Sequence, residues 1–376
     1  MSESTYHKII SAGHICLDIT PVFPASKSSA NVGDVLVPGK LINVDAADVH
    51  TGGSVANTGL ALKILGADVE LMGKIGTDPF GGMVKDIAKG YGVSGLIEDQ
   101  DSSTSYSVVL AVPGVDRIFL HNPGANDTFR NSDIKDESLN DAALFHFGYP
   151  PLMRSMFVED GVELIKMLKR MKDKGIATSL DFAAIDPDAE SGKADWKKIL
   201  SGALKYVDFF VPSFEELCFM LNRPLYDSLA LKGGDMACLI DFEKDVKPMA
   251  DELIELGAGV VLIKCGTKGM YYKTSGKKRL SSVGSRLALD VDMWADKEGI
   301  VKCYKADKVL SGTGAGDTSI AAFLMALMDK KSPEWCVKLA AAEGACAVTT
   351  YDALGGLKPL KELEERINNG WEILED

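Results

Sequence analysis

The sequence lacks the cysteine and histidine spacings of a disulfide framework or a structural metal site. Its seven cysteines are scattered and odd in number, and no C-x-x-C pair occurs. We therefore interpret them as small buried residues of a protein in a reducing compartment. The five histidines show no H-x-x-x-H or similar spacing, so none of them is assigned to a metal.

Long apolar runs and an excess of positive charge are also missing. The longest apolar run lies within residues 319–328, about half of what a membrane-spanning helix needs. The first residues, MSESTYHKII, contain no basic segment leading into an apolar core, so no signal peptide is expected. The formal net charge of -13 argues against nucleic acid or anionic membranes as partners. We expect a cytoplasmic protein.

Two common nucleotide-binding motifs are absent as well. No G-x-x-x-x-G-K-[ST] occurs, which excludes a Walker A loop, and no G-x-G-x-x-G follows the first predicted strand. The second absence argues against a nucleotide-dependent oxidoreductase, one of the functions that an α/β chain of this length could have.

The pattern of the chain indicates an α/β fold. From about residue 142 onward, short apolar strands alternate with helical segments, which predicts a doubly wound, mostly parallel sheet with helices on both faces. Strand-like pieces at about 20–50 and 104–122 interrupt this rhythm. The stretch DVLVPGKLINVDAADVHT (34–51) alternates weakly, as short solvent-facing strands do, and STSYSVVLAVPGVDRIFLHN (103–122) predicts a hairpin with its turn at Pro113–Gly114. We interpret them as a small sheet inserted into a single domain that spans 1–376. Residues 222–245 show no interpretable pattern.

A glycine-rich stretch, SGTGAGD, ends at Asp317 and precedes a long apolar segment. We predict a helix that begins at about Gly316, whose first N–H groups and dipole would form an anion site. Glycine lets the backbone approach a phosphate closely. A carboxylate at this place would serve as a base for a hydroxyl that attacks the phosphorus. The alternative is an ordinary N-capping aspartate after a glycine turn.

A second glycine pair, Gly52 and Gly53, precedes another predicted helix, with Asn57 about one turn inside it. Bare backbone and an amide at this place suit a polar ligand, although a tight turn alone would explain them. Asp18 follows the first strand, where ligands of parallel sheets gather, or is a turn residue. Glu216, in VPSFEEL, could hold a metal through water, or could belong to a solvated helix N-terminus.

Two long stretches together resemble a known family. GGSVANTGLALKILGADVELMGKIGTDPFGGMV (52–84) and SGTGAGDTSIAAFLMAL (311–327) are similar to the two signature regions of ribokinase-like, PfkB-type carbohydrate kinases. The resemblance extends from about Ile9 to Leu357. It implies a doubly wound α/β domain with a small β-sheet lid, and ATP-dependent phosphorylation of a hydroxyl of a small sugar or sugar derivative.

The resemblance also implies roles for particular residues. Asp317 would be the catalytic base, with an anion hole formed by Gly314, Ala315 and Gly316. Substrate hydroxyls would be bound by Asp18, Gly52, Gly53, Asn57 and Asn126. The nucleotide would be bound by Gly266, Thr267, Gly269, Thr313, Gly314 and Gly316. ATP and Mg²⁺ are the implied cofactors, with Glu216 reaching the metal through water.

The sequence departs from the family pattern at several positions. Ser213 stands where Asn usually begins an N-x-x-E motif, and Ser311 stands where Asp usually shapes a monovalent-cation loop, so a K⁺ requirement is left open. Gly148 replaces a glutamate that touches ribose in ribokinases, so ribose is not implied. A nucleoside kinase and a non-catalytic sugar or nucleotide sensor of the same fold remain alternatives. Pairing of two lids predicts a homodimer.

Overall fold

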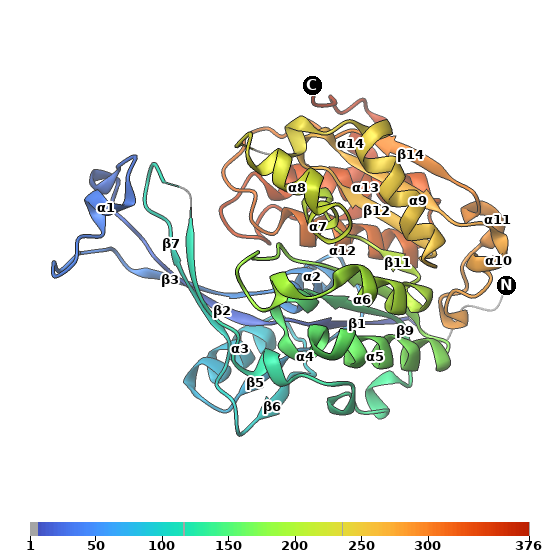
Figure 1. Cartoon of the computed structure of the whole chain (residues 1–376), viewed down its shortest axis with the longest axis horizontal. Helices are drawn as coiled ribbons and strands as arrows, with labels where there is room; N and C mark the ends of the chain where they lie inside the picture. The colour runs from blue at the N-terminus through green and yellow to red at the C-terminus, as the bar shows by residue number, and fades with distance from the viewer. Residues whose placement is uncertain (1–6, 116, 235, 376) are drawn as a thin grey trace.

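The computed structural model describes residues 7–115, 117–234 and 236–375. Its centre is an eight-stranded sheet in the order β14-β13-β12-β11-β10-β9-β1-β4 (Figure 1). The strands from β12 to β4 are parallel, whereas β13 and β14 are antiparallel at one edge. The strands are β1 (Lys8–Gly13), β4 (Val69–Met72), β9 (Ala142–Gly148), β10 (Ala177–Asp181), β11 (Phe209–Phe210), β12 (Val260–Lys264), β13 (Met270–Thr274) and β14 (Glu298–Val301).

Successive residues of the central strands enter two separate hydrophobic cores, one on each face of the sheet. On one face Ile9 and Leu144 pack in one core, and on the other face Ile10 and Phe145 pack in the second. Strands buried on both faces are apolar throughout, as is typical of parallel sheets between helices. This arrangement confirms the predicted α/β class with a mainly parallel sheet.

Helices cover both faces of this sheet. One core contains residues of α2 (Ser54–Ile64), α12 (Ala315–Met328) and α13 (Pro333–Ala347). The other contains residues of α5 (Val162–Asp173), α6 (Trp196–Ala203), α7 (Phe214–Leu221) and α9 (Lys247–Glu255). Residues 222–245, for which the sequence made no prediction, include α8 (Arg223–Ala230). No helix in the described ranges is long and apolar enough to cross a membrane.

A second, four-stranded sheet projects from the body in the order β3-β2-β7-β8 (Figure 1). Its strands are β2 (Cys16–Pro21), β3 (Ala47–Gly52), β7 (Tyr106–Leu110) and β8 (Ile118–Asn122), and β7 and β8 form the predicted hairpin. Of the short strands predicted within 34–51, only β3 is formed. Instead, Asn31 accepts a hydrogen bond from the Gly33 N–H and caps the short helix α1 (Val32–Val35), and the chain after it is irregular up to β3.

The order of the main sheet defines where a ligand would bind. Strand β1 lies between β4 and β9. The chain passes from β1 to β4 on one side and later returns to β9 on the other side, so the strand order reverses at β1. In parallel sheets a ligand crevice is expected at the carboxyl ends of the strands beside such a reversal. The ends of β1 and β9 approach closely: a Cβ on Gly13 would lie 2.2 Å from the Gly148 carbonyl oxygen. Gly148, Asp181 and Lys264 end their strands at this same edge.

Candidate active site

The glycine-rich loop leads into α12 as the sequence predicts, with the helix beginning at Ala315. Gly314 precedes it in a left-handed conformation (φ 72°), and a Cβ there would lie 2.2 Å from that of Ala353, so only glycine fits. The Ser311 hydroxyl accepts a hydrogen bond from the Thr313 N–H (3.1 Å) and so orders the loop. Asp317 lies in the first turn of α12 and is 3% exposed.

Three side chains from two other segments donate hydrogen bonds to the Asp317 carboxylate. Asn57 Nδ2 lies 2.9 Å from Oδ2, the Tyr149 hydroxyl lies 2.8 Å from both oxygens, and the Thr58 hydroxyl lies 3.5 Å from Oδ1. Burial raises the pKa of Asp317, and the hydrogen bonds from Asn57 and Tyr149 oppose that shift. The packing of α2 against α12 therefore brings the two signature stretches together.

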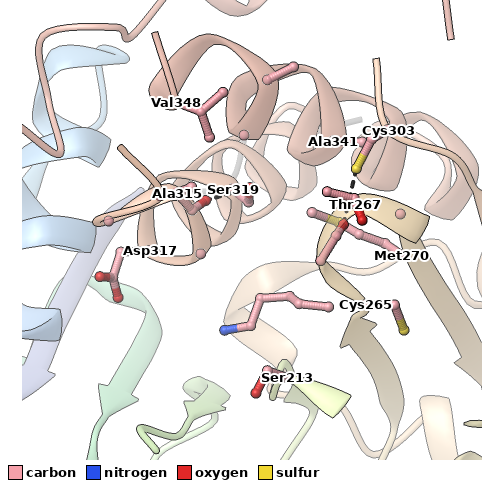
Figure 2. Close-up of a pocket in the computed structure, with 18 of the residues that line it drawn as sticks. Ser213, Cys265, Thr267, Met270, Cys303, Ala315, Asp317, Ser319, Ala341 and Val348 are labelled. Carbon is pink, nitrogen blue, oxygen red and sulfur yellow. Dashed lines mark hydrogen bonds between the residues drawn. The ribbon is translucent and has the colours of Figure 1, made fainter. Parts of the chain in front are cut away.

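A cavity of about 680 Å³ opens beside this carboxylate (Figure 2). Its polar end contains Asp317, and its far end is lined by small and apolar side chains such as Ala341 and Val348. The lining residues include most of those predicted to bind the nucleotide: Gly266, Thr267, Gly269, Gly314 and Gly316. The cavity is large enough for a nucleotide, with an apolar end that suits a base and an N–H-rich end that suits phosphates.

Lys264 and Asp181 form a buried ion pair at the polar end of the cavity. Lys264 Nζ lies 2.8 Å from Asp181 Oδ1, and a Cβ added to Gly316 would lie 3.6 Å from the same Nζ, which places the ammonium beside the first turn of α12. Burial lowers the pKa of Lys264, but the carboxylates of Asp181, Glu216 and Asp317 outweigh it and raise the pKa. Lys264 therefore stays protonated and presents a positive charge to the cavity.

Sequence reasoning did not single out Lys264, although one signal was present. Lysine ends the apolar run VVLI of a buried parallel strand, and a charge at that position is costly unless a partner or ligand compensates it.

Glu216 also lines the cavity, and the Ser213 departure leaves its local structure intact. The Ser213 hydroxyl accepts from the Glu216 N–H (3.3 Å), and the Glu216 carboxylate accepts from the Ser213 N–H (2.7 Å). This reciprocal capping box begins α7 and holds the carboxylate in place. Within the described ranges, no three His, Cys, Asp or Glu residues are grouped to hold a metal on their own.

The residues predicted to bind the substrate are not among those that line this cavity, and most of them lie where the small sheet meets α2. Strands β2 and β3 place Asp18 against Gly52, and a Cβ on Gly52 would lie 2.2 Å from the Asp18 carboxylate. Gly53 has a φ of 83°, and a Cβ there would lie 2.5 Å from the His14 carbonyl oxygen. The protein's own packing therefore requires both glycines, whether or not a ligand approaches them.

Buried polar atoms without partners gather at this place. Both ring nitrogens of His14 and the Ser54 hydroxyl are buried and make no hydrogen bond within the described part of the chain. The His14 ring lies 6.2 Å from that of Tyr149 and 5.3 Å from that of His121, measured between centroids. Burial lowers the pKa of His14 to about 3, so its ring is neutral and offers one donor and one acceptor. Sequence reasoning missed both His14 and Tyr149.

Asn126, which was predicted to bind substrate, and the cationic side chains of Lys74 and Arg117 already have protein partners. The Asn126 side chain accepts from the Ile15 N–H (3.2 Å) and donates to the Ile15 carbonyl (2.9 Å), so it joins residues 124–128 to the segment between β1 and β2. Lys74 forms ion pairs with Asp99 (3.2 Å) and Asp133 (3.3 Å). Arg117, which precedes β8, donates to the Thr313 hydroxyl and so connects the small sheet with the glycine-rich loop.

Comparison with known proteins identifies the family of this chain. The family model described as pfkB family carbohydrate kinase matches residues 8–358. The chain belongs to the pfkB family of carbohydrate kinases. Probable fructokinase-4 of Arabidopsis thaliana is 25% identical over 368 residues, which cover 95% of each chain.

Solved structures of the same fold cover nearly the whole chain. An Arabidopsis thaliana ribokinase complexed with ribose and ATP superposes with a TM-score of 0.67 at 20% identity, covering 96% of this chain and 98% of that one. An E. coli protein in complex with ATP and Mg²⁺ gives 0.69 at 20% identity, covering 96% and 99%. These likenesses confirm the ribokinase-like fold of this carbohydrate kinase.

Glu343, on α13 beside the cavity, makes stability depend on pH. Its Oε1 accepts from the Lys358 N–H (3.0 Å), Oε2 has no partner within the described residues, and burial raises the pKa to about 8 from 4.5. Between these values the folded state binds more protons than the unfolded state, so this contribution to stability is present at pH 4.5 and is lost as pH rises through 8.

We therefore expect Glu343→Gln to reduce the loss of stability between pH 5 and pH 9. The free energy of unfolding of the wild type should fall relative to the variant by on the order of 2 kcal/mol over this range, measured by urea denaturation. Glu365→Gln, at an exposed position of helix α14 (Leu360–Asn368), is the control and should leave the difference between pH 5 and pH 9 as in the wild type. Parallel curves for wild type and Glu343→Gln would contradict the prediction.

Proposed function

We propose that this carbohydrate kinase transfers the γ-phosphoryl group of ATP to a hydroxyl of a small sugar or sugar derivative, with Asp317 as the base. The observation that carries this proposal is the place of Asp317. Asp317 lines the nucleotide-sized cavity, and Tyr149, which donates to it, lies beside the ring of His14 and its polar neighbours. A carboxylate between two such sites can contact an acceptor hydroxyl and a phosphoryl group at once.

The proposed reaction is a direct phosphoryl transfer. The acceptor oxygen attacks the γ-phosphorus, a new P–O bond forms, the bond to the β,γ-bridging oxygen breaks, and the hydroxyl proton passes to the Asp317 carboxylate. Developing charge on the transferred group would be stabilised by the N–H groups of Gly314, Ala315 and Gly316. Lys264 would add a fixed positive charge beside them.

Magnesium fits the donors at the polar end of the cavity. The carboxylates of Glu216 and Asp181 line it, and oxygen donors of this kind suit Mg²⁺, which takes most of its other ligands from phosphates and water. When bound, the ion would neutralise phosphate charge next to these carboxylates. No feature of the described chain supports a K⁺ requirement.

The acceptor site would be closed by the small sheet, acting as a lid. Asp18, Asn57, His14 and Ser54 supply donors and acceptors, and the unpaired buried atoms of the last two are a feature that a hydroxyl-rich ligand would satisfy. Phe119 and Leu120 on the edge strand β8 are each more than half exposed, which suits the expected pairing of two lids. The homodimer stays a prediction.

The test is ADP release in a coupled assay with ATP, Mg²⁺ and a panel of neutral sugars, sugar acids and nucleosides. We expect turnover with one class of sugar, above the rate without acceptor. Turnover with nucleosides alone would replace the proposed acceptor. ATP binding measured by calorimetry, without ADP release on any acceptor of the panel, would overturn the proposal.

A further inference from the structure

Tyr149 has an unusual backbone that directs its side chain to Asp317. It follows the last residue of β9 and has φ 66° and ψ 43°, a left-handed conformation that costs a non-glycine residue about 1–2 kcal/mol. Its N–H donates to the Asp181 carbonyl (3.2 Å), and the turn that follows, Pro150–Leu152, begins with two prolines. Strain of this kind persists where the surrounding structure enforces it, and it is concentrated at functional sites.

The phenol of Tyr149 is a permanent donor to the carboxylate. Its oxygen lies 2.8 Å from both Asp317 oxygens. Burial and the neighbouring Asp317 carboxylate raise the pKa of Tyr149 well above its usual value, so the hydroxyl keeps its proton. Asn57 donates to Oδ2, so Oδ1 is the less engaged oxygen: among the described residues, its one donor besides Tyr149 is Thr58, at 3.5 Å.

The groups that face Asp317 divide into those that favour its charge and those that oppose it. The ionised form of Asp317 is favoured by Tyr149, by Lys264 of β12, and by Asn57 and Thr58 of α2, and it is opposed by burial. Two other carboxylates nearby, those of Asp181 and Glu216, interact with the same Lys264 ammonium as Asp317 does. Burial lowers the pKa of the two nearby histidines, His14 and His146, to about 3, so both rings are neutral. Of the donors, only Tyr149 contacts both oxygens.

We propose that Tyr149 is a positioning residue for Asp317, which holds the carboxylate in the orientation and the ionised state that phosphoryl transfer needs. This inference rests on the proposed function of Asp317. The tyrosine acts through the carboxylate: it fixes the carboxyl plane, directs Oδ1 toward the acceptor hydroxyl and offsets part of the cost of a buried charge.

The test is the pH dependence of kcat/KM in Tyr149→Phe, with Tyr226→Phe on α8 as a matched control outside the site. Losing the phenol hydroxyl should move the acidic limb to higher pH by about one unit, because the ionised form of Asp317 loses a donor. Below the limb the activity should fall by about ten-fold, and on the plateau at higher pH it should stay within a few-fold of wild type. Incorporating 3-fluorotyrosine at position 149, a stronger donor, should shift the limb the other way.

A role in packing alone would lower activity equally at every pH, or lower the melting temperature without moving the limb, and either result would overturn the proposal. A second readout does not need activity: ¹³Cγ-aspartate NMR, with Asp317→Asn to assign the signal. The Asp317 titration should shift upward in Tyr149→Phe. If the wild-type protein phosphorylates no acceptor, the proposed function fails, but the NMR titration still tests whether Tyr149 stabilises the ionised form of Asp317. If the Asp317 titration does not shift in Tyr149→Phe, the inference is overturned even when the enzyme is active.

Discussion

Replacing Asp317 by asparagine is expected to lower kcat by about two to four orders of magnitude while ATP binding is retained. The amide has nearly the same shape and can still accept from Asn57, but it cannot take the proton of the acceptor hydroxyl. Because Asp317 is buried, the neutral amide should not lower the free energy of unfolding. The measurements are steady-state ADP release, ATP binding by calorimetry and urea denaturation of both proteins.

The control for this variant is Asp195→Asn. Asp195 is also an aspartate at a helix N-terminus, where it caps α6 by accepting from the Lys198 N–H (3.0 Å), and it lies outside the cavity lining. It should change stability slightly and leave kcat unchanged. If Asp317→Asn kept kcat within a few-fold of wild type, Asp317 would be a capping residue only, which is the alternative that the sequence left open.

Replacing Lys264 by methionine is expected to damage both stability and activity. The substitution leaves the Asp181 carboxylate buried without its partner, which costs about 3–5 kcal/mol in comparable ion pairs. It also removes the positive charge beside the first turn of α12, for which we expect a loss in kcat/KM on the order of a hundred-fold. Unfolding in urea and the coupled assay give the two quantities separately.

A double variant separates the two effects. Lys264→Met combined with Asp181→Asn removes both charges, so most of the lost stability should return, whereas activity should not. Lys277→Met is the control: this lysine of α10 (Lys277–Leu280) pairs with Asp292 (2.5 Å) at a site where both side chains are mostly exposed, and its loss should change the free energy of unfolding only slightly. Activity that returned together with stability in the double variant would show that Lys264 serves the fold alone.

Features that depend on neighbours along the chain were predictable from the sequence. The start of α12, the hairpin of β7 and β8 and the apolar parallel strands each follow from a local pattern of glycine, turn residues or continuous hydrophobic side chains. The weak alternation over 34–51 predicted β3 correctly but was wrong before it, since capping by Asn31 and the turn residues that follow favour a short helix and irregular chain.

Contacts between distant segments were not predictable in the same way. Asn57 and Asp317 are 260 positions apart, and their hydrogen bond requires α2 to pack against α12. Tyr149 reaches the same carboxylate through the end of β9 and a left-handed backbone, a conformation that no local pattern around a tyrosine favours. The partner of Lys264 is set by the order of β10, β11 and β12 in the sheet.

The sequence by itself determined the family, the fold class and the position of the carboxylate in the first turn of α12. These features depend on residues that are close together in the chain: two glycine-rich helix starts and the alternation of strands and helices. Only the tertiary structure decided how that carboxylate is held and what charge faces it. A buried charge is stabilised by donors that the fold brings from other strands and helices, and their distances from Asp317 exist only once the sheet is assembled.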